Sequence, residues 1–313
     1  MKISIVSGLL TALCFNLVAS SSFLRRIYKP IIYLKEDDLD VSDDCSKKLE
    51  PYKKCAEKIS STFSEIRDIV DDLIGICDPT YQSIFNKDSC KSKALEVAEK
   101  ACKAVEVDEC KDFVSNDSII KVINDGNCIE KEDGQDILIS LAVSKAAYNV
   151  ICSKTSAGKY CPIVQYAIDK GYDEFFNKLD TYVEQIGNVS KNIVQNEDLV
   201  GDAKDLITTV IPKDVLVAVG DNCRDNECNN KVLEIIGMAE ALKQQASSKL
   251  KIDVEKIYPN AYALYNTYAQ SYKDMKCSTI DGGEDGERDS ASSNKKITLT
   301  FAMMLIISVF LLI

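Results

Sequence analysis

Cysteines are the residues of this chain whose number and spacing most clearly predict chemistry. The 313-residue sequence holds 13 of them, and Cys14 lies in an apolar N-terminal stretch. The other twelve are an even number, which is typical of a disulfide framework made in an oxidising compartment. They are Cys45, Cys55, Cys77, Cys90, Cys102, Cys110, Cys128, Cys152, Cys161, Cys223, Cys228 and Cys277. Spacing does not give their pairing, although Cys77 with Cys90 and Cys152 with Cys161 would each suit a bond across a helical hairpin.

Metal binding is the alternative chemistry for these cysteines. The closest two, Cys223 and Cys228, are separated by four residues, and the chain contains neither a C-x-x-C pair nor a histidine. Zinc sites normally use such ligands at such spacings. The stretch from Asp221 to Asn230 gathers oxygen ligands, but it lacks the glycine and the terminal glutamate of an EF-hand loop. We therefore expect no metal site, and a solvated disulfide turn at this place.

The absence of histidine also limits catalysis. It excludes Ser-His and Cys-His nucleophiles and histidine-based zinc hydrolysis. A pair of carboxylates could still hydrolyse a sugar, but no pair stands out among the 49 acidic residues, and the chain has no tryptophan to support a sugar ring. The sequence thus predicts no catalytic residue and no cofactor, and a protein that is not an enzyme.

A row of tyrosines near the end of the cysteine-rich region is the best candidate for a binding face. The five recur every three or four residues, so they would line one side of a helix. An aromatic ring with a polar tip suits a protein interface or a groove, whereas ordinary core contacts with hydroxyls at the rim would give the same pattern. The row comprises Tyr258, Tyr262, Tyr265, Tyr268 and Tyr272.

Charge and sequons describe the expected surface. The formal net charge is −11, and loss of Lys2, Lys295 and Lys296 with the terminal segments would make it more negative. Such a surface repels phosphate backbones, so nucleic acid is not an expected partner. Two N-glycosylation sequons begin at Asn116 and Asn188, and the central Asp117 makes the first a poorer acceptor.

The N-terminal end predicts entry into the secretory pathway. Residues 1–20 combine Lys2, an apolar stretch and the small residues Ala19 and Ser20, which is typical of a signal peptide. A buried N-terminal helix is the alternative. Residues 21–44 form an N-terminal extension in which Arg25-Arg26 resembles a dibasic processing site.

The C-terminal end predicts attachment to a lipid. Residues 297–313 carry no charge and would make a helix of about 26 Å, slightly short of the hydrocarbon core. Small residues around Ser290, then a polar spacer and this apolar tail, match a glycosylphosphatidylinositol (GPI) signal, with Ser290 or Asp289 as attachment residue. The alternative is a single membrane-spanning helix over 297–313, but its basic residues would lie on the lumenal side.

Helical periodicity predicts the elements that position these residues. Apolar residues every three or four positions indicate long helices from Tyr52 to Cys77, with Pro51 at the start, and from Val164 to Ile186. Shorter helices are expected over 90–105, 111–122, 136–152, 199–211 and 231–250. The stretch from Val215 to Val219 is the best strand candidate, although it suits a short helix equally well.

The expected molecule is therefore an all-α, disulfide-rich ectodomain over residues 45–277, which a boundary near 128–135 could divide into two helical lobes. A loose duplication would relate a close cysteine pair in each half, 102/110 and 223/228. Residues 278–290 read as an acidic, glycine-rich stalk and 291–313 as the GPI propeptide. The expected function is non-catalytic adhesion, coat structure or partner recognition at the outer face of the plasma membrane. The alternative is an extracellular carrier of a sterol or fatty acid.

Overall fold

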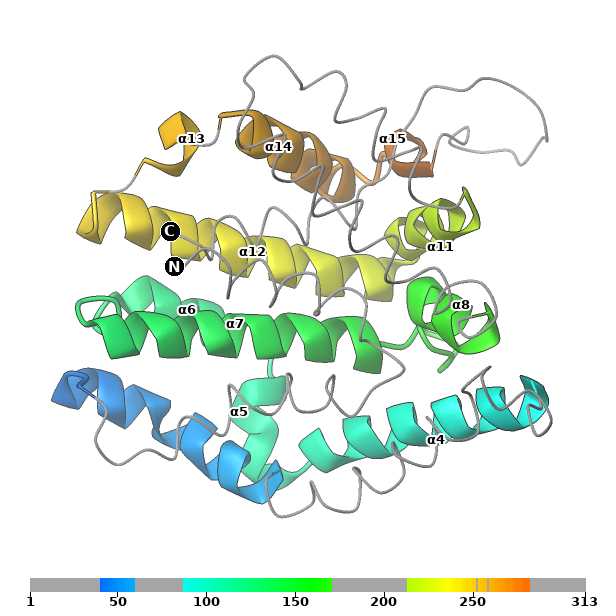
Figure 1. Ribbon diagram of the computed structural model, residues 1–313, viewed down its shortest axis with the longest axis horizontal. Helices are drawn as coiled ribbons and strands as arrows, with labels where there is room; N and C mark the ends of the chain where they lie inside the picture. The colour runs from blue at the N-terminus through cyan, green and yellow to red at the C-terminus, as the bar shows by residue number, and fades with distance from the viewer. Residues whose placement is uncertain (1–39, 60–86, 171–212, 252, 258, 282–313) are drawn as a thin grey trace, which may run out of the picture. The chain divides into compact units, whose positions relative to one another are not determined.

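The computed structural model describes residues 40–59, 87–170, 213–251, 253–257 and 259–281 (Figure 1). These residues fold into helices, and their only extended pairing is an isolated bridge between Lys154 and Tyr160. Five disulfide bonds join the helical segments of this described part. The protein is therefore an all-α, disulfide-rich fold, as the sequence predicts.

The contacts within the chain divide the described residues into two compact units. Unit 1 contains 153–170, 213–236, 253–257 and 259–281, and unit 2 contains 40–59, 87–152 and 237–251. The residues near 128–135, where the sequence suggests a lobe boundary, lie inside unit 2.

Unit 2 is organised around helix α7, Glu132–Cys152, against which α4 and α6 pack (Figure 1). Helix α7 buries Leu138 and Leu141 together with the polar residues Ser144, Lys145 and Asn149. The other described helices are one over 43–59, α4 (Lys87–Val105), the short 3-10 helix η2 (Asp108–Cys110), α5 (Lys111–Val114), α6 (Ser118–Asp125) and the second half of α12.

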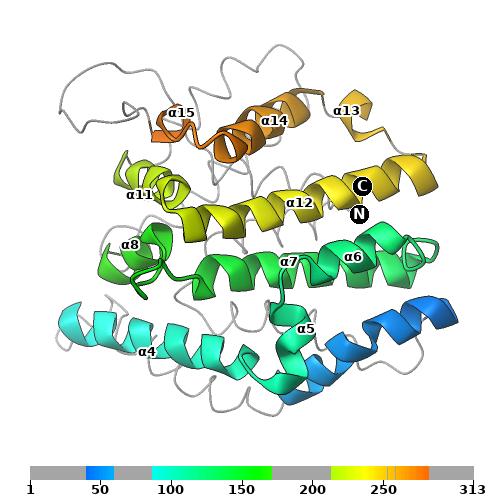
Figure 2. The same cartoon turned by 180° about the vertical axis from the view of Figure 1, so that it is seen from behind.

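Unit 1 gathers α8 and α15 against α11, and Figure 2 shows these three beside one another. Its bonded cysteines Cys161, Cys223, Cys228 and Cys277 are all buried. The helices of unit 1 are α8 (Pro162–Lys170), α11 (Lys213–Arg224), the first half of α12 (Asn226–Lys249), α13 (Val254–Ile257), α14 (Pro259–Lys273) and α15 (Ser278–Asp281).

Disulfide bonds connect segments that are distant in the sequence. Unit 2 contains Cys45–Cys128, Cys55–Cys110 and Cys102–Cys152, with sequence separations of 83, 55 and 50. Unit 1 contains Cys161–Cys228 and Cys223–Cys277, with separations of 67 and 54. The suggested pairing of Cys152 with Cys161 is therefore wrong, because each is bonded to a remote helix. The suggested pairing of Cys77 with Cys90 involves residue 77, which lies outside the described residues.

The first helix begins earlier than the periodicity predicts. It is helical from residue 43, so Pro51 lies inside it rather than at its start. The Ser42 side chain accepts a hydrogen bond from the backbone N–H of Cys45 at 3.2 Å, which caps the helix at this earlier point. Cys45 and Leu49 are both fully buried and extend the apolar stripe toward the cap.

Other predicted elements are present with changed limits. The single helix expected over 111–122 is two helices, α5 and α6, separated by a turn in which Asp117 has a left-handed backbone (φ 60°). Helices α4, α7 and α12 match 90–105, 136–152 and 231–250, with earlier starts. The strand candidate at 215–219 lies in α11. The predicted segments 60–77, 171–186 and 199–211 lie outside the described residues.

Candidate functional site

Helix α14 carries the predicted tyrosine row, and one side of it packs in the core of unit 1. Tyr265 is 1% exposed, and its hydroxyl donates to the backbone carbonyl of Ile236 on α12 at 3.3 Å. Tyr272 is 0% exposed, and its backbone carbonyl accepts a hydrogen bond from the Asn229 side chain at 3.4 Å. These two tyrosines therefore hold α14 against the first half of α12.

The remaining tyrosines of the row differ in position. Tyr262 is partly exposed, and its ring stacks on that of Tyr265 with centroids 6.2 Å apart. Tyr268 lies on α14, and Tyr258 lies outside the described residues. The structure thus buries two rings of the row and leaves Tyr262 partly exposed, so a binding role for the row would depend on Tyr262.

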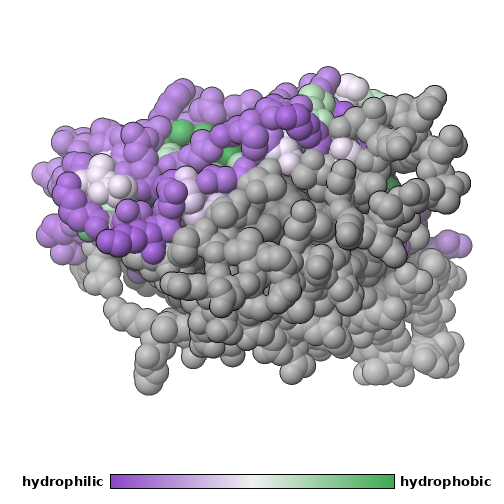
Figure 3. Space-filling model, turned by 90° about the horizontal axis from the view of Figure 1, so that it is seen from above, coloured by the Kyte–Doolittle hydropathy of each residue, from purple (hydrophilic) through white to green (hydrophobic). Residues whose placement is uncertain are grey.

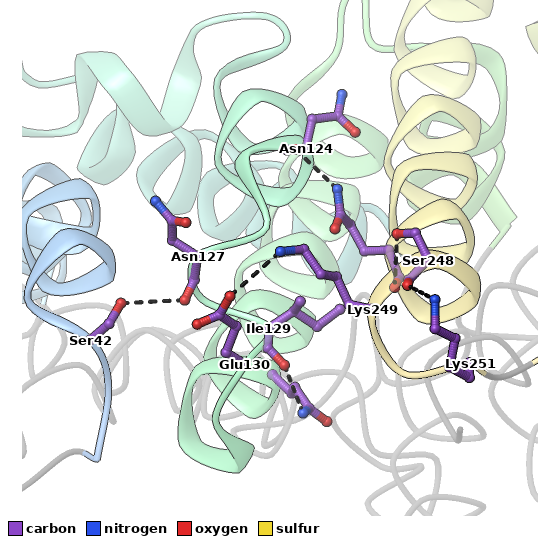
Figure 4. Close-up of polar contacts among 10 residues, drawn as sticks. Ser42, Asn124, Asn127, Ile129, Glu130, Ser248, Lys249 and Lys251 are labelled. Atoms are coloured by element: carbon purple, nitrogen blue, oxygen red, sulfur yellow. Dashed lines mark hydrogen bonds and ion pairs between the residues drawn. The ribbon is translucent and has the colours of Figure 1, made fainter.

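A second concentration of polar residues surrounds the loop between α6 and α7, residues 126–131 (Figure 4). The Ser42 hydroxyl donates to the carbonyl of Asn127, and the Gln135 side chain donates to that of Ile129 at 2.9 Å. The Gln245 side chain on α12 donates to the carbonyl of Asn124 at 3.0 Å. Three segments of unit 2 therefore meet at this loop, which Cys128 also ties to Cys45.

The charges around this loop are balanced in pairs. Lys249 lies 3.5 Å from Glu130, Lys131 lies 3.1 Å from Asp40, and Lys48 pairs with Asp125. Because these pairs are largely exposed, each contributes about 0–1 kcal/mol. The arrangement is a structural junction of unit 2.

Lys145 is the unexpected polar residue of the core. It is 0% exposed on α7, and its ammonium donates to the carbonyls of Phe113, Val114 and Ser115 at 2.9, 2.7 and 3.2 Å. The Nζ also lies 5.8 and 5.4 Å from the ring centroids of Phe113 and Tyr148. These carbonyls end helix α5, so Lys145 neutralises the negative end of that helix from a different element.

Shifted pKa values occur at separate places. Burial raises the pKa of Tyr52, whereas a hydrogen bond with Ser118 acts in the opposite direction. Hydrogen bonds from Lys100 and Lys93 lower the pKa of the exposed Glu96. A hydrogen bond from Lys276 does the same for Asp274. These groups belong to different elements, so the shifts do not mark a catalytic cluster.

The solvated turn expected over 221–230 is not present: a single residue, Asp225, turns the chain between the end of α11 and the start of α12, and Asn222 and Asn229 are buried. Asp225 accepts a hydrogen bond from the backbone N–H of Cys228 at 3.0 Å and so caps α12, while Asp221 lies 3.4 Å from Arg224. Both cysteines of this stretch are in disulfide bonds. Within the described ranges, no group of three Cys, Asp or Glu side chains is placed to hold a metal ion.

The remaining predicted sites are surface features. Asn116 is exposed in the turn between α5 and α6, which makes it accessible to a glycan, and Asn188 lies outside the described residues. Asp289 and Ser290 also lie outside them. Among the helices that the structure describes, none is both long enough and apolar enough to cross a membrane.

Sequence reasoning missed Lys145 and the role of the loop at 126–131. A lysine between apolar residues of a predicted helix carries a weak signal, because its partners come from a segment 30 residues away. Comparison of the chain with protein-family models, with curated proteins and with solved structures gives no match. The function must therefore be argued from the chain itself.

Proposed function

We propose that the protein is a GPI-anchored, non-catalytic cell-surface protein whose disulfide-linked helical ectodomain acts in adhesion, coat structure or partner recognition. The observation that carries the proposal is the set of disulfides, which join segments 50 to 83 residues apart. Bonds of this number form and persist in oxidising compartments and are rare in the cytosol. The framework is typical of a secretory or extracellular protein.

The chain ends supply the argument for anchorage. The predicted signal peptide at 1–20 would direct the chain into the secretory pathway. The small residues at 289–292, the polar spacer and the apolar tail would then direct transfer to a lipid at Ser290 or Asp289. The basic residues Lys295 and Lys296 precede the apolar tail and would lie on the lumenal side of a single-pass helix, an arrangement that suits an excised signal better.

The surface supports recognition rather than catalysis. The chain has no histidine and carries a net charge of −11. The described residues seen from above in Figure 3 are mostly hydrophilic, with small hydrophobic areas between them. Among the described residues, the exposed large hydrophobic side chains are Leu95 and Met275. A hydrophilic surface on a chain of negative net charge suits a protein presented at a crowded cell surface.

The alternative of an apolar-ligand carrier depends on an internal cavity. Tyr265 and Tyr272 are fully buried in unit 1, and Phe113 in unit 2, where Lys145 places an ammonium among the buried residues. An internal charge does not suit the wall of an apolar cavity, so we favour recognition over carriage of a sterol or fatty acid. Organic extraction and mass spectrometry of the purified protein separate the two, because a carrier would yield about one lipid per chain.

Treatment of intact cells with phosphatidylinositol-specific phospholipase C tests the anchor. The cells express a copy with an epitope tag after Asp38, downstream of Arg25-Arg26, and the measured quantities are release into the medium and the intact mass of the released chain. We expect release, with Ser290 or Asp289 at the C-terminus bearing a glycan remnant. Retention of a chain that still ends at Ile313 would overturn the proposed anchorage.

Two variants serve as controls for this experiment. A chain ended after Asp289 should be secreted without the enzyme, which shows that the ectodomain folds and leaves the cell. A chain in which Asp289, Ser290 and Ala291 are all replaced by leucine should no longer be released from cells by the phospholipase, because lipid attachment requires small residues. Unchanged release of this second variant would place the attachment residue elsewhere in the tail.

A further inference from the structure

The disulfides contain a repeated pattern that goes beyond the proposed function. Four cysteines of unit 2 form two bonds, Cys55–Cys110 and Cys102–Cys152. Four later cysteines form two more, Cys161–Cys228 and Cys223–Cys277. In each set, taken in chain order, the first cysteine bonds to the third and the second to the fourth. Both pairs of bonds are therefore interleaved in the same sense.

The spans of the bonds also correspond. The bond between the first and third cysteines has a separation of 55 residues in the first set and 67 in the second. The bond between the second and fourth cysteines has separations of 50 and 54 residues. Four cysteines allow three pairings, so a shared pairing alone would arise about one time in three by chance. The matching spans make chance a weaker explanation.

The helical setting of the cysteines supplies an independent correspondence. The second cysteine lies in the last turn of a helix, Cys102 in α4 and Cys223 in α11. The third lies near the start of a following α-helix: Cys110 ends η2 and directly precedes α5, and Cys228 is in the first turn of α12.

The fourth cysteine follows the same rule. Cys152 is the last residue of α7, and Cys277 lies four residues after the end of α14, directly before α15. In both sets, therefore, the two cysteines of the close pair have different partners. The third bonds to the first, in an earlier segment, and the second bonds to the fourth, at or after the end of the last long helix.

We propose that the chain contains two copies of one disulfide module, residues 55–152 and residues 161–277, placed consecutively and not cross-linked to each other. The modules are defined by their disulfide bonds and do not coincide with the two compact units, because residues 237–251 of the second module belong to unit 2. The bond Cys45–Cys128 is an addition on the first module, since Cys45 precedes it.

Residues 153–160 separate the modules and form a short hairpin. The N–H of Thr155 donates to the carbonyl of Lys159 at 2.8 Å, and that of Cys161 donates to Ser153 at 3.0 Å. Residues 156–159 are exposed, and Gly158 has open space around it. A cut here would leave each of the five described disulfides within one fragment, which makes the hairpin the place to test the proposal.

The test inserts a recognition sequence for a site-specific protease between Gly158 and Lys159 of the full chain. After cleavage, the protein is denatured without reductant and separated by electrophoresis. We expect two fragments, because no bond crosses the hairpin. A single band that separates only after reduction would overturn the proposal, since it requires a bond between the modules.

The matched control places the same sequence between Asn116 and Asp117, in the exposed turn between α5 and α6. Here Cys45–Cys128 and Cys102–Cys152 cross the cut, so the cleaved chain should remain one band until it is reduced. Mass spectrometry of non-reduced peptides from the two hairpin fragments then identifies the pairings. The interleaved pairing in both fragments supports the repeat, and a nested or sequential pairing in either one overturns it.

Discussion

Lys145 places an ammonium in a fully buried position, where an unpaired charge would be strongly unfavourable. Its three hydrogen bonds to the end of α5 compensate for the lost hydration, and the rings of Phe113 and Tyr148 lie near the charge. The same bonds hold the carbonyls of residues 113–115 in place. Lys145 therefore binds the C-terminal end of α5, although it belongs to α7.

Replacement of Lys145 by methionine should lower the free energy of unfolding by about 1–3 kcal/mol, because methionine fills the space but leaves the three carbonyls without this donor. Guanidinium unfolding followed by circular dichroism at constant disulfide content measures the change. Lys121→Met, at an exposed position of α6, is the control and should remain within about 0.5 kcal/mol of the native chain. Equal stability of both variants would show that the buried bonds contribute little.

Tyr52 gives the stability a dependence on alkaline pH. Its pKa is raised mainly by burial, so the folded chain favours the neutral phenol. A raised pKa means that this contribution is fully present below the unfolded value of about 10 and is lost as the pH rises through the folded value. Tyr52→Phe should therefore flatten the decline in stability above pH 10. Unfolding curves between pH 8 and 11 check this, and parallel curves for both chains would contradict it.

At the scale of the elements, the sequence predicts which segments are helical better than where they end. Residues 111–122 have a helical apolar pattern, yet the chain breaks at Asp117. Tertiary and local contacts both hold this break: Lys145 binds the carbonyls that precede the turn, and the Ser118 hydroxyl donates to the carbonyl of Ser115. By contrast, the early start at residue 43 has a local cause, the cap at Ser42, which was visible in the sequence.

The predicted binding face had the same limitation. Periodicity places Tyr262, Tyr265 and Tyr272 on one side of a helix, but it does not tell which side of α14 meets α12. The burial of Tyr265 and Tyr272 depends on contacts with residues 29 and 43 positions away. Disulfide pairing is non-local for the same reason, so the cysteines were predictable and their partners were not.

Helix α7 and the loop before it fit closely at Gly134. A Cβ atom at this position would collide with the backbone carbonyl of Cys128, which cannot move as a side-chain end can. Alanine normally stabilises a helix by about 1 kcal/mol relative to glycine. Gly134→Ala should do the opposite, and we expect reduced secretion and a lower melting temperature, both measurable on the purified chain.

Gly237→Ala is the matched comparison for this prediction. Gly237 also lies inside a helix, but its added Cβ would approach only the Cδ1 atom of Ile120, at 3.0 Å. The end of an isoleucine side chain can shift by the few tenths of an ångström that this requires. Gly237→Ala should therefore melt near the native temperature. A Gly134→Ala chain that melts as high as Gly237→Ala would show that the loop gives way without cost.

At the scale of the whole molecule, both the disulfides and the buried apolar residues contribute to the free energy of unfolding. Closing a loop of 50 to 83 residues in the unfolded chain contributes about 4 kcal/mol for each bond on the chain-entropy estimate. Because this value grows only with the logarithm of the span, the five bonds should contribute similar amounts. Their combined effect exceeds the net stability of about 5–15 kcal/mol that is usual for a folded domain.

Reduction should therefore unfold the protein at room temperature. We expect the reduced and alkylated chain to lose its near-ultraviolet circular dichroism and its cooperative thermal transition. Without the bonds, the conformational entropy of the unfolded chain favours unfolding by more free energy than burial of apolar area supplies. A mock-treated chain, carried through the same steps without reductant, should keep both signals. A cooperative transition in the reduced chain would contradict this prediction, because it would mean that the helices are stable without covalent bonds.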